Sequence, residues 1–120
     1  IESRRSLDEP PGTELADFEE YAHLYAIAWS DPAIAWLLST LPSDMIFDDH
    51  DVRDDWNTSA QWRAEMEATS WWHGRIVAAL ASYWVYQHLG NLSAAERAED
   101  EVWQVVAAHE GPGELDLTAT

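Results

Sequence analysis

The stretch Met45–Asn57 most constrains this chain, because five of the eight residues from Asp48 to Asp55 are aspartates. Neighbouring carboxylates repel one another, so such a run persists where a positive charge offsets the repulsion. A divalent metal is the simplest such charge. The three apolar residues 45–47 come directly before the run and predict the end of a short buried strand, with the aspartates in the loop that follows it.

Composition allows one folded unit and excludes several kinds of site. The chain has 120 residues, of which 47% are hydrophobic, enough for one domain or a piece of one. Its 23 acidic and 6 basic residues give a formal net charge of −17, which disfavours binding to nucleic acid through a basic surface. It contains no cysteine, so a metal would be held by oxygen and imidazole alone.

The sequence can also indicate membrane spans, a signal peptide and closing elements at its two ends. No segment approaches the roughly 18–20 consecutive apolar residues of a membrane span, and the start carries no apolar signal-peptide core, so no compartment is indicated. The chain begins at Ile1 and finishes on a polar run that contains glycine and proline. We therefore expect a piece of a larger protein.

Apolar spacing and capping residues predict a mostly helical chain. The expected segments are an arm at 1–12, helices at 13–41, a strand and acidic loop at 42–58, helices at 59–109 and a flexible tail at 110–120. Within the second helical segment the pattern breaks near 69–70. Ser93 and Glu96 form a capping box, which predicts a last helix over 94–108.

Local signals set the expected bounds of the first two helices. Thr13 is the expected N-cap of a helix that ends at Trp29. Asp31 and Pro32 predict a cap followed by proline at the first helical position. The resulting helix, 32–40, is so apolar that we expect it to be largely buried.

The expected fold class is mostly α, with one short β-strand near 44–48. A single strand leaves its N–H and C=O groups without partners. Either its partner strands lie outside these 120 residues, or the stretch is an extended loop.

The run Asp48–Asp51 offers the two ligand types that a metal centre needs. Hard cations prefer carboxylate oxygen, and iron, manganese and zinc also accept imidazole. Asp49 can face a metal and His50 a substrate, while Asp48 or Asp51 orients the imidazole. This division suits metal-assisted phosphate chemistry, with Arg53 contacting a phosphate oxygen. The structural alternative is a solvated acidic turn, in which Asp48 or Asp51 serves as a cap.

The run Met45–Asp51, together with Trp56 and Asn57, resembles the signature of the PhoD-like (alkaline phosphatase D) phosphatases, a branch of the binuclear metallophosphoesterases. The resemblance covers most of Leu15–Glu101. It implies that Asp49 is a metal ligand, that His50 is the substrate-side catalytic histidine and that the parent domain is an α/β sandwich. It further implies phosphate-ester hydrolysis with two divalent or trivalent metal ions, drawn from calcium, iron, manganese and zinc.

The predicted site also includes supporting residues and is incomplete. The residues expected to orient the two principal groups or to contact substrate are Asp48, Asp51, Arg53, Asp55, Trp56 and Asn57. Trp56 is expected to form a wall of the site and limit access of water. The family's other ligand blocks, an early Asp-x-His or Gly-Asp element and a late Gly-His-x-His element, are absent. We therefore expect the middle of a larger catalytic domain, inactive or weakly active without the remainder of the parent chain.

Two other functions fit parts of the sequence. One is an acidic helical module that binds a basic partner, with the aspartate loop at most a cation site. The other is an HD-type phosphohydrolase, an all-helical metal enzyme, because His23, His50-Asp51 and Asp100 occur in the required order. That doublet belongs on a helix, whereas here it follows a strand-like run. The single histidines predicted to have structural or surface roles are His23, His73, His88 and His109.

Overall fold

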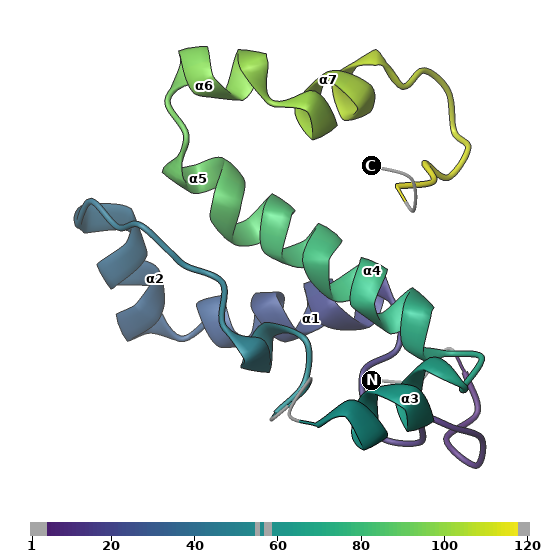
Figure 1. Cartoon of the computed structure of the whole chain (residues 1–120). Helices are drawn as coiled ribbons and strands as arrows, with labels where there is room; N and C mark the ends of the chain where they lie inside the picture. The colour runs from purple at the N-terminus through teal and green to yellow at the C-terminus, as the bar shows by residue number, and fades with distance from the viewer. Residues whose placement is uncertain (1–4, 55, 57–58, 118–120) are drawn as a thin grey trace.

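The computed structural model describes residues 5–54, 56 and 59–117. This part of the chain is mostly helical and contains no β-strand (Figure 1). Its elements are α1 (Phe18–Trp29), α2 (Pro32–Thr40), the 3-10 turn η1 (Asp49–Asp51), α3 (Ala60–Glu67), α4 (Trp72–Tyr83), the π-helical turn η2 (Trp84–His88), α5 (Leu89–Asn91), α6 (Ala94–Glu99) and α7 (Glu101–Ala108). No helix of the described chain is both long and apolar enough to cross a membrane.

A long rod formed by α4, η2 and α5 organises the fold (Figure 1). Helix α1 packs across this rod, α3 lies at one end of it, and α6 with α7 lies across the other end. The core sits where α1, α4 and the acidic loop meet. Its buried hydrophobic members are Tyr21, Val52, Trp72, Ala78 and Ala79. Because this core is small, many apolar side chains elsewhere stay exposed.

Helix α1 begins later than the sequence predicts. Asp17, not Thr13, is the N-cap, because its carboxylate accepts the backbone N–H of Glu20 at 2.9 Å. Glu20 is in turn paired with Arg5, at 2.9 Å between Nε and Oε1. The segment before Phe18 is thereby held against α1 by side-chain bonds, and the predicted arm is attached to the fold through Arg5.

Helix α2 has the predicted bounds but not the predicted burial. Asp31 accepts the backbone N–H groups of the first turn, and Pro32 opens the helix. However, α2 has no buried residue, and Trp36 is 63% exposed. The helix that it contacts most is α1. A helix that packs mainly against one neighbour leaves much of its remaining surface in solvent, whatever its composition.

The predicted strand near 44–48 is wrong, because 42–48 is extended chain that pairs with no other strand in the described part. The side-chain amide of Asn91 takes the place of a neighbouring strand. Its Oδ1 accepts the N–H of Met45 at 2.9 Å, and its Nδ2 donates to the C=O of Met45 at 2.6 Å. Phe47 packs edge-on against Tyr83, with ring centroids 5.3 Å apart.

The helices after residue 59 begin and end largely where local sequence signals predict, but one predicted helix is divided in two. The interruption near 69–70 is confirmed, as is the capping box of Ser93 and Glu96. The predicted helix over 94–108 is divided into α6 and α7 at Asp100. That residue is extended and its carboxylate accepts the backbone N–H of Trp103 at 2.7 Å, so it caps a new helix.

Candidate metal centre

The acidic run folds into η1 because its carboxylates accept backbone hydrogen bonds. Asp48 Oδ1 accepts the N–H of His50 at 3.1 Å, and Asp51 Oδ2 accepts the N–H of Asp48 at 2.8 Å. This reciprocal pair is a capping box on a single turn of 3-10 helix. Backbone dipoles thus offset part of the repulsion between the aspartates.

The turn is anchored to the helices through the buried residue Val52. Its carbonyl oxygen accepts three bonds, from Tyr21 Oη at 2.7 Å and from Arg75 Nη2 and Nε at 2.9 and 3.1 Å. The buried guanidinium of Arg75 also pairs with Glu14, at 2.5 Å between Nη1 and Oε2. Burial raises the pKa of the Tyr21 hydroxyl, which keeps it protonated as a donor. The acidic loop is therefore presented from a fixed point.

His50 lies between three carboxylates. Its Nδ1 is 2.8 Å from Asp48 Oδ1 and 2.9 Å from Asp49 Oδ1, while its Nε2 is 2.8 Å from Asp54 Oδ1. The hydrogen bonds to Asp48 and then Asp49 raise the pKa of the imidazole above its ordinary value. Reciprocally, the backbone N–H and then the ring of His50 lower the pKa of Asp48. The surrounding carboxylates thus favour the protonated imidazole, whose positive charge would offset part of their repulsion without a metal.

The donor atoms of Asp48, Asp49 and His50 lie close enough together to form a candidate metal-binding group. One ligand atom from each lies within 4.8 Å of the other two, and this is the one such group within residues 5–54, 56 and 59–117. Two carboxylate oxygens with an imidazole nitrogen suit manganese, iron or zinc, and the oxygens alone suit calcium. A metal would bind the neutral imidazole of His50, whereas the neighbouring carboxylates favour its protonated form. Three ligands suffice for one cation, so the described residues do not provide for two.

Asp51 and Arg53 have partners other than those expected of them. Asp51 Oδ1 accepts from Gln87 Nε2 at 2.7 Å, which ties the turn to η2, so Asp48 rather than Asp51 orients the imidazole. The guanidinium of Arg53 pairs with Glu14, at 3.0 Å between Nη2 and Oε1. A phosphate contact by Arg53 would have to compete with that pair.

The other predicted site residues contribute less to this geometry. Trp56 packs beside Trp72, with ring centroids 6.3 Å apart at the edge of the core, and its expected role as a wall of the site stays a prediction. Asp55 and Asn57 lie outside the described residues. Side chains of α1 line a cavity of about 380 Å³ together with His50.

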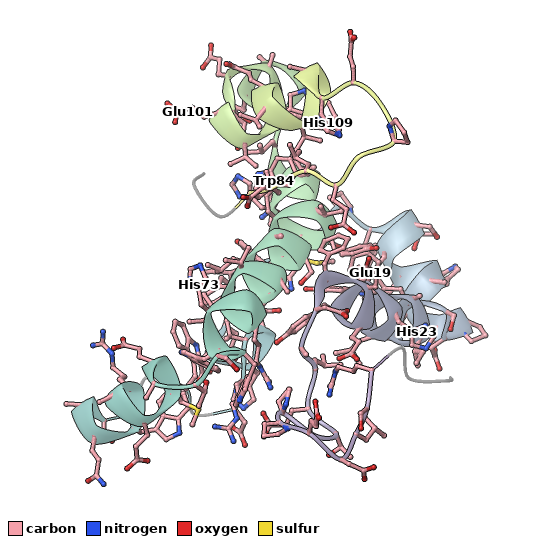
Figure 2. All side chains as sticks on the ribbon, turned by 90° about the vertical axis from the view of Figure 1, so that its right-hand side faces the viewer. Glu19, His23, His73, Trp84, Glu101 and His109 are labelled. Carbon is pink, nitrogen blue, oxygen red and sulfur yellow. The ribbon has the colours of Figure 1, made fainter. Side chains whose placement is uncertain are left out.

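The HD-type arrangement finds no geometric support in the described chain. His23 is exposed on α1, and Asp100 caps α7 while lying 3.6 Å from His88 Nε2. Neither belongs to the group of potential ligands around His50. Figure 2 shows His23, His73 and His109 on separate parts of the molecule. The doublet itself lies on a single 3-10 turn, not on an α-helix.

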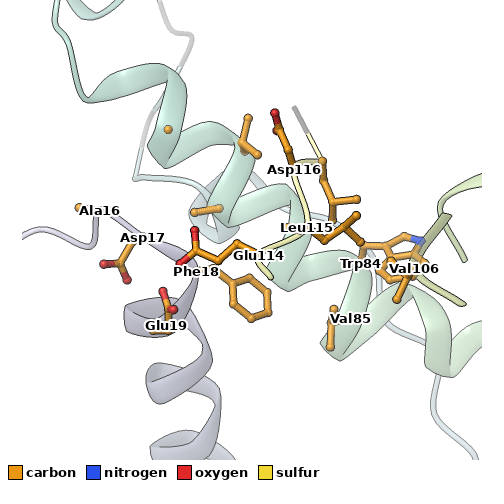
Figure 3. Close-up of a pocket in the computed structure, with 15 residues that line it drawn as sticks. Ala16, Asp17, Phe18, Glu19, Trp84, Val85, Val106, Glu114, Leu115 and Asp116 are labelled. Atoms are coloured by element: carbon orange, nitrogen blue, oxygen red, sulfur yellow. The ribbon is translucent and has the colours of Figure 1, made fainter. Parts of the chain in front are cut away.

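A second, larger cavity lies away from this chemistry. It measures about 790 Å³ and is bounded by the start of α1, by α4, by Val106 of α7 and by residues 114–117 (Figure 3). Its lining is apolar side chains with carboxylates, and it includes neither histidine nor arginine among the described residues. Size alone therefore does not locate the candidate site.

Sequence reasoning missed the residues that hold the loop, namely Tyr21, Arg75 and Glu14. A lone arginine within the mainly apolar run 71–80 is the signal that can indicate a buried ion pair. Its partner, 61 residues away, carries no corresponding signal.

Comparisons with protein-family models, with curated proteins and with solved structures found no match to this chain. The residues and their geometry are therefore the basis for inferring a function. Together these define a carboxylate–imidazole site on a helical scaffold.

Proposed function

We propose that this chain supplies one wall of the active site of a metal-dependent phosphoesterase, a PhoD-like metallophosphatase. Asp49 is the metal ligand and His50 is the group that faces the substrate. The cluster of Asp48, Asp49 and His50 carries this proposal, because donor atoms of the right kinds converge on a turn that Val52 anchors. Such anchoring favours catalysis, since a site held in place loses little freedom when it binds.

The position of His50 supports a role as general acid. Asp48 and Asp49 hold Nδ1, which leaves Nε2 to donate a proton to a leaving alkoxide oxygen. The Nε2 partner, Asp54, is 78% exposed in its side chain. A surface pair of this kind contributes little stability, so a substrate oxygen can displace it. When bound, metal ions would polarise a phosphoryl oxygen and lower the pKa of a coordinated water.

The proposal includes ligands from the remainder of the parent chain. With His50 kept for the substrate, the group at Asp48–His50 leaves carboxylate oxygens for metal, whereas the proposed chemistry uses two metal ions. Further histidine and aspartate ligands, and the α/β sandwich that carries them, would complete the site. The 120 residues alone would then be weakly active or inactive.

The test is hydrolysis of p-nitrophenyl phosphate and bis(p-nitrophenyl) phosphate by the polypeptide that contains this sequence, with manganese, iron, calcium or zinc added. We expect His50→Ala to lower kcat by about 100-fold or more, the usual contribution of a general acid. Asp49→Asn should raise the metal concentration needed for half-maximal rate. The matched control is Asp44→Asn, which changes an exposed aspartate in the extended segment that precedes the turn. Hydrolysis that tolerates both His50→Ala and removal of metal would overturn the proposal.

The second candidate is an acidic interaction module for a basic partner. The observation that favours it is the exposed apolar face of α2 and the following segment, where Trp36 and Ile46 are 63% and 86% exposed, on a chain of net charge −17. Under this function, Trp36→Ser would weaken binding of the partner, and added salt would weaken it further. His50→Ala and added metal would change neither the binding of the partner nor its dependence on salt.

A further inference from the structure

A cavity of about 380 Å³ opens beside His50, between α1 and the acidic loop. Its α1 wall is Leu24, Tyr25, Ala28 and Trp29, and its loop wall is His50, Asp51, Val52, Arg53 and Asp54. Leu15 and the buried side chains of Tyr21 and Arg75 also line it. The volume falls in the range of small-molecule sites, which combine a mainly apolar lining with a few polar groups.

The aromatic part of the α1 wall is already in place. The ring of Tyr25 is stacked on Tyr86, with centroids 4.6 Å apart and planes 17° from parallel. Trp29 meets Tyr25 edge-on at 5.2 Å, and the Tyr25 hydroxyl accepts from Gln87 Nε2 at 2.7 Å. Rings held by several neighbours present an apolar surface without the entropic cost of ordering it on binding.

Charges on the loop wall discriminate between ligands. His50 and Arg53 are the hydrogen-bond donors on the loop wall that one phosphoryl group can approach, although each already has carboxylate neighbours. Asp51 and Asp54 lie on the same wall, and the whole chain carries a net charge of −17. Additional negative charge on a ligand would therefore be repelled, whereas a neutral apolar group would meet α1 without penalty.

From this geometry we infer that the cavity binds the alcohol portion of a phosphate ester, an uncharged group of aromatic size, with the phosphoryl group beside His50. The placement of the phosphoryl group rests on the proposed function. The preference of the cavity for an aromatic group does not depend on turnover. The substrate class is thus phosphate esters of bulky neutral alcohols, rather than polyanionic phosphates.

Binding of non-hydrolysable probes to the 120-residue chain tests this inference. Phenylphosphonate and methylphosphonate carry the same headgroup and differ in the apolar group alone. We expect phenylphosphonate to bind at least about tenfold more tightly, since even one methylene in an apolar pocket is worth about that factor. A third probe, 4-phosphonobenzoate, adds a negative charge to the ring and should bind more weakly than phenylphosphonate. Ligand-observed NMR titration gives the three dissociation constants.

Two tryptophan substitutions on α1 provide a matched pair. Ala28→Trp fills the cavity, while Ala26→Trp adds the same side chain to an exposed position that does not line it. Circular dichroism checks that both variants retain their helices. Leu24→Ser, at a half-exposed position of the α1 wall, is a second variant that removes apolar surface without adding bulk. Ala28→Trp and Leu24→Ser should abolish the preference for the phenyl probe, and Ala26→Trp should preserve it.

These experiments distinguish failure of the inference about the cavity from failure of the proposed catalytic function. Equal affinities for the phenyl and methyl probes, or equal effects of the two tryptophans, would overturn the inference about the cavity. If hydrolysis by the parent polypeptide needs His50 but is indifferent to Ala28→Trp with aryl esters, the cavity inference alone fails. If phenylphosphonate binds in the cavity and the parent polypeptide shows no metal-dependent hydrolysis, the proposed function alone fails.

Discussion

The guanidinium of Arg75 donates two hydrogen bonds to the main-chain carbonyl of Val52, at 2.9 and 3.1 Å, across 23 residues of sequence. Both residues are buried, and the same guanidinium pairs with Glu14. One side chain therefore joins α4, the acidic loop and the segment before α1. The position of His50 relative to the helices depends on this junction.

Replacing Arg75 with methionine should destabilise the chain by about 2–3 kcal/mol, because the Val52 carbonyl then loses charged donors in a buried place. Breaking a fully buried ion pair costs about 3–5 kcal/mol of stability. The cost here should be lower, since the Glu14 side chain is 38% exposed. Urea unfolding measures the change. Arg63→Met is the control, because its pair with Glu67 is exposed and 4.0 Å long, and it should cost less than about 0.5 kcal/mol. Equal costs for the two variants would contradict the role of Arg75.

In the metal-free chain, NMR titration of the ring protons should show His50 titrating above its ordinary value of about 6.5. Because its pKa is raised in the folded state, its pairing stabilises the fold fully below the unfolded pKa. That contribution is lost as pH rises through the folded pKa. Asp48→Asn removes the carboxylate whose hydrogen bond contributes most to the raised pKa of His50, and should lower that pKa. Asp44→Asn should leave it unchanged. A pKa unchanged by Asp48→Asn would show that other groups hold the proton.

Manganese, iron, calcium or zinc should raise the thermal unfolding temperature if the group at Asp48–His50 binds metal in this chain. At ten times the dissociation constant, binding contributes about 1.4 kcal/mol to stability. Asp49→Ala should abolish the shift by removing both carboxylate oxygens, and Asp44→Ala should retain it. Differential scanning fluorimetry gives the measurement. The metal assignment fails if none of the four ions shifts the transition, or if the shift survives Asp49→Ala.

Asn91→Ala should release the extended segment 42–48. The substitution leaves both backbone groups of Met45 without their present partners, which costs about 1–3 kcal/mol where they are shielded from water. Amide hydrogen exchange followed by mass spectrometry should show faster exchange in this segment than in α4. Gln61→Ala is the control, since Gln61 bonds to Glu65 on the surface of α3. Unchanged exchange over 42–48 would mean that Phe47 holds the segment without Asn91.

Local signals in the sequence predicted much of the helical pattern. Asp31 before Pro32, and Ser93 with Glu96, mark helix starts that the structure confirms. These signals act between residues at most about four apart, so they survive whatever the rest of the chain does. The prediction that Thr13 caps α1 was wrong, because a second local signal competes with it. Asp17, four residues further on, is the N-cap in the structure.

The candidate site was predictable in its chemistry but not in its connections. Adjacent positions ensure that Asp48, Asp49 and His50 lie close together, and the structure brings their donor atoms within 4.8 Å. The partners of Asp51 and Arg53 were not predictable. Gln87 and Glu14 lie 36 and 39 residues away, and only packing decides that they meet.

The sequence by itself determined a mostly helical, cysteine-free and strongly acidic chain with a carboxylate–imidazole run at 48–51, because composition and short-range spacing carry that information. Only the tertiary structure decided that Arg75 anchors the run through the Val52 carbonyl and that α2 stays exposed. It also decided that the Asn91 side chain, rather than a neighbouring strand, bonds to the backbone of Met45. Those relationships depend on the path of the chain between residues distant in sequence. The free energy of burying or pairing a group is known only once its neighbours are in place.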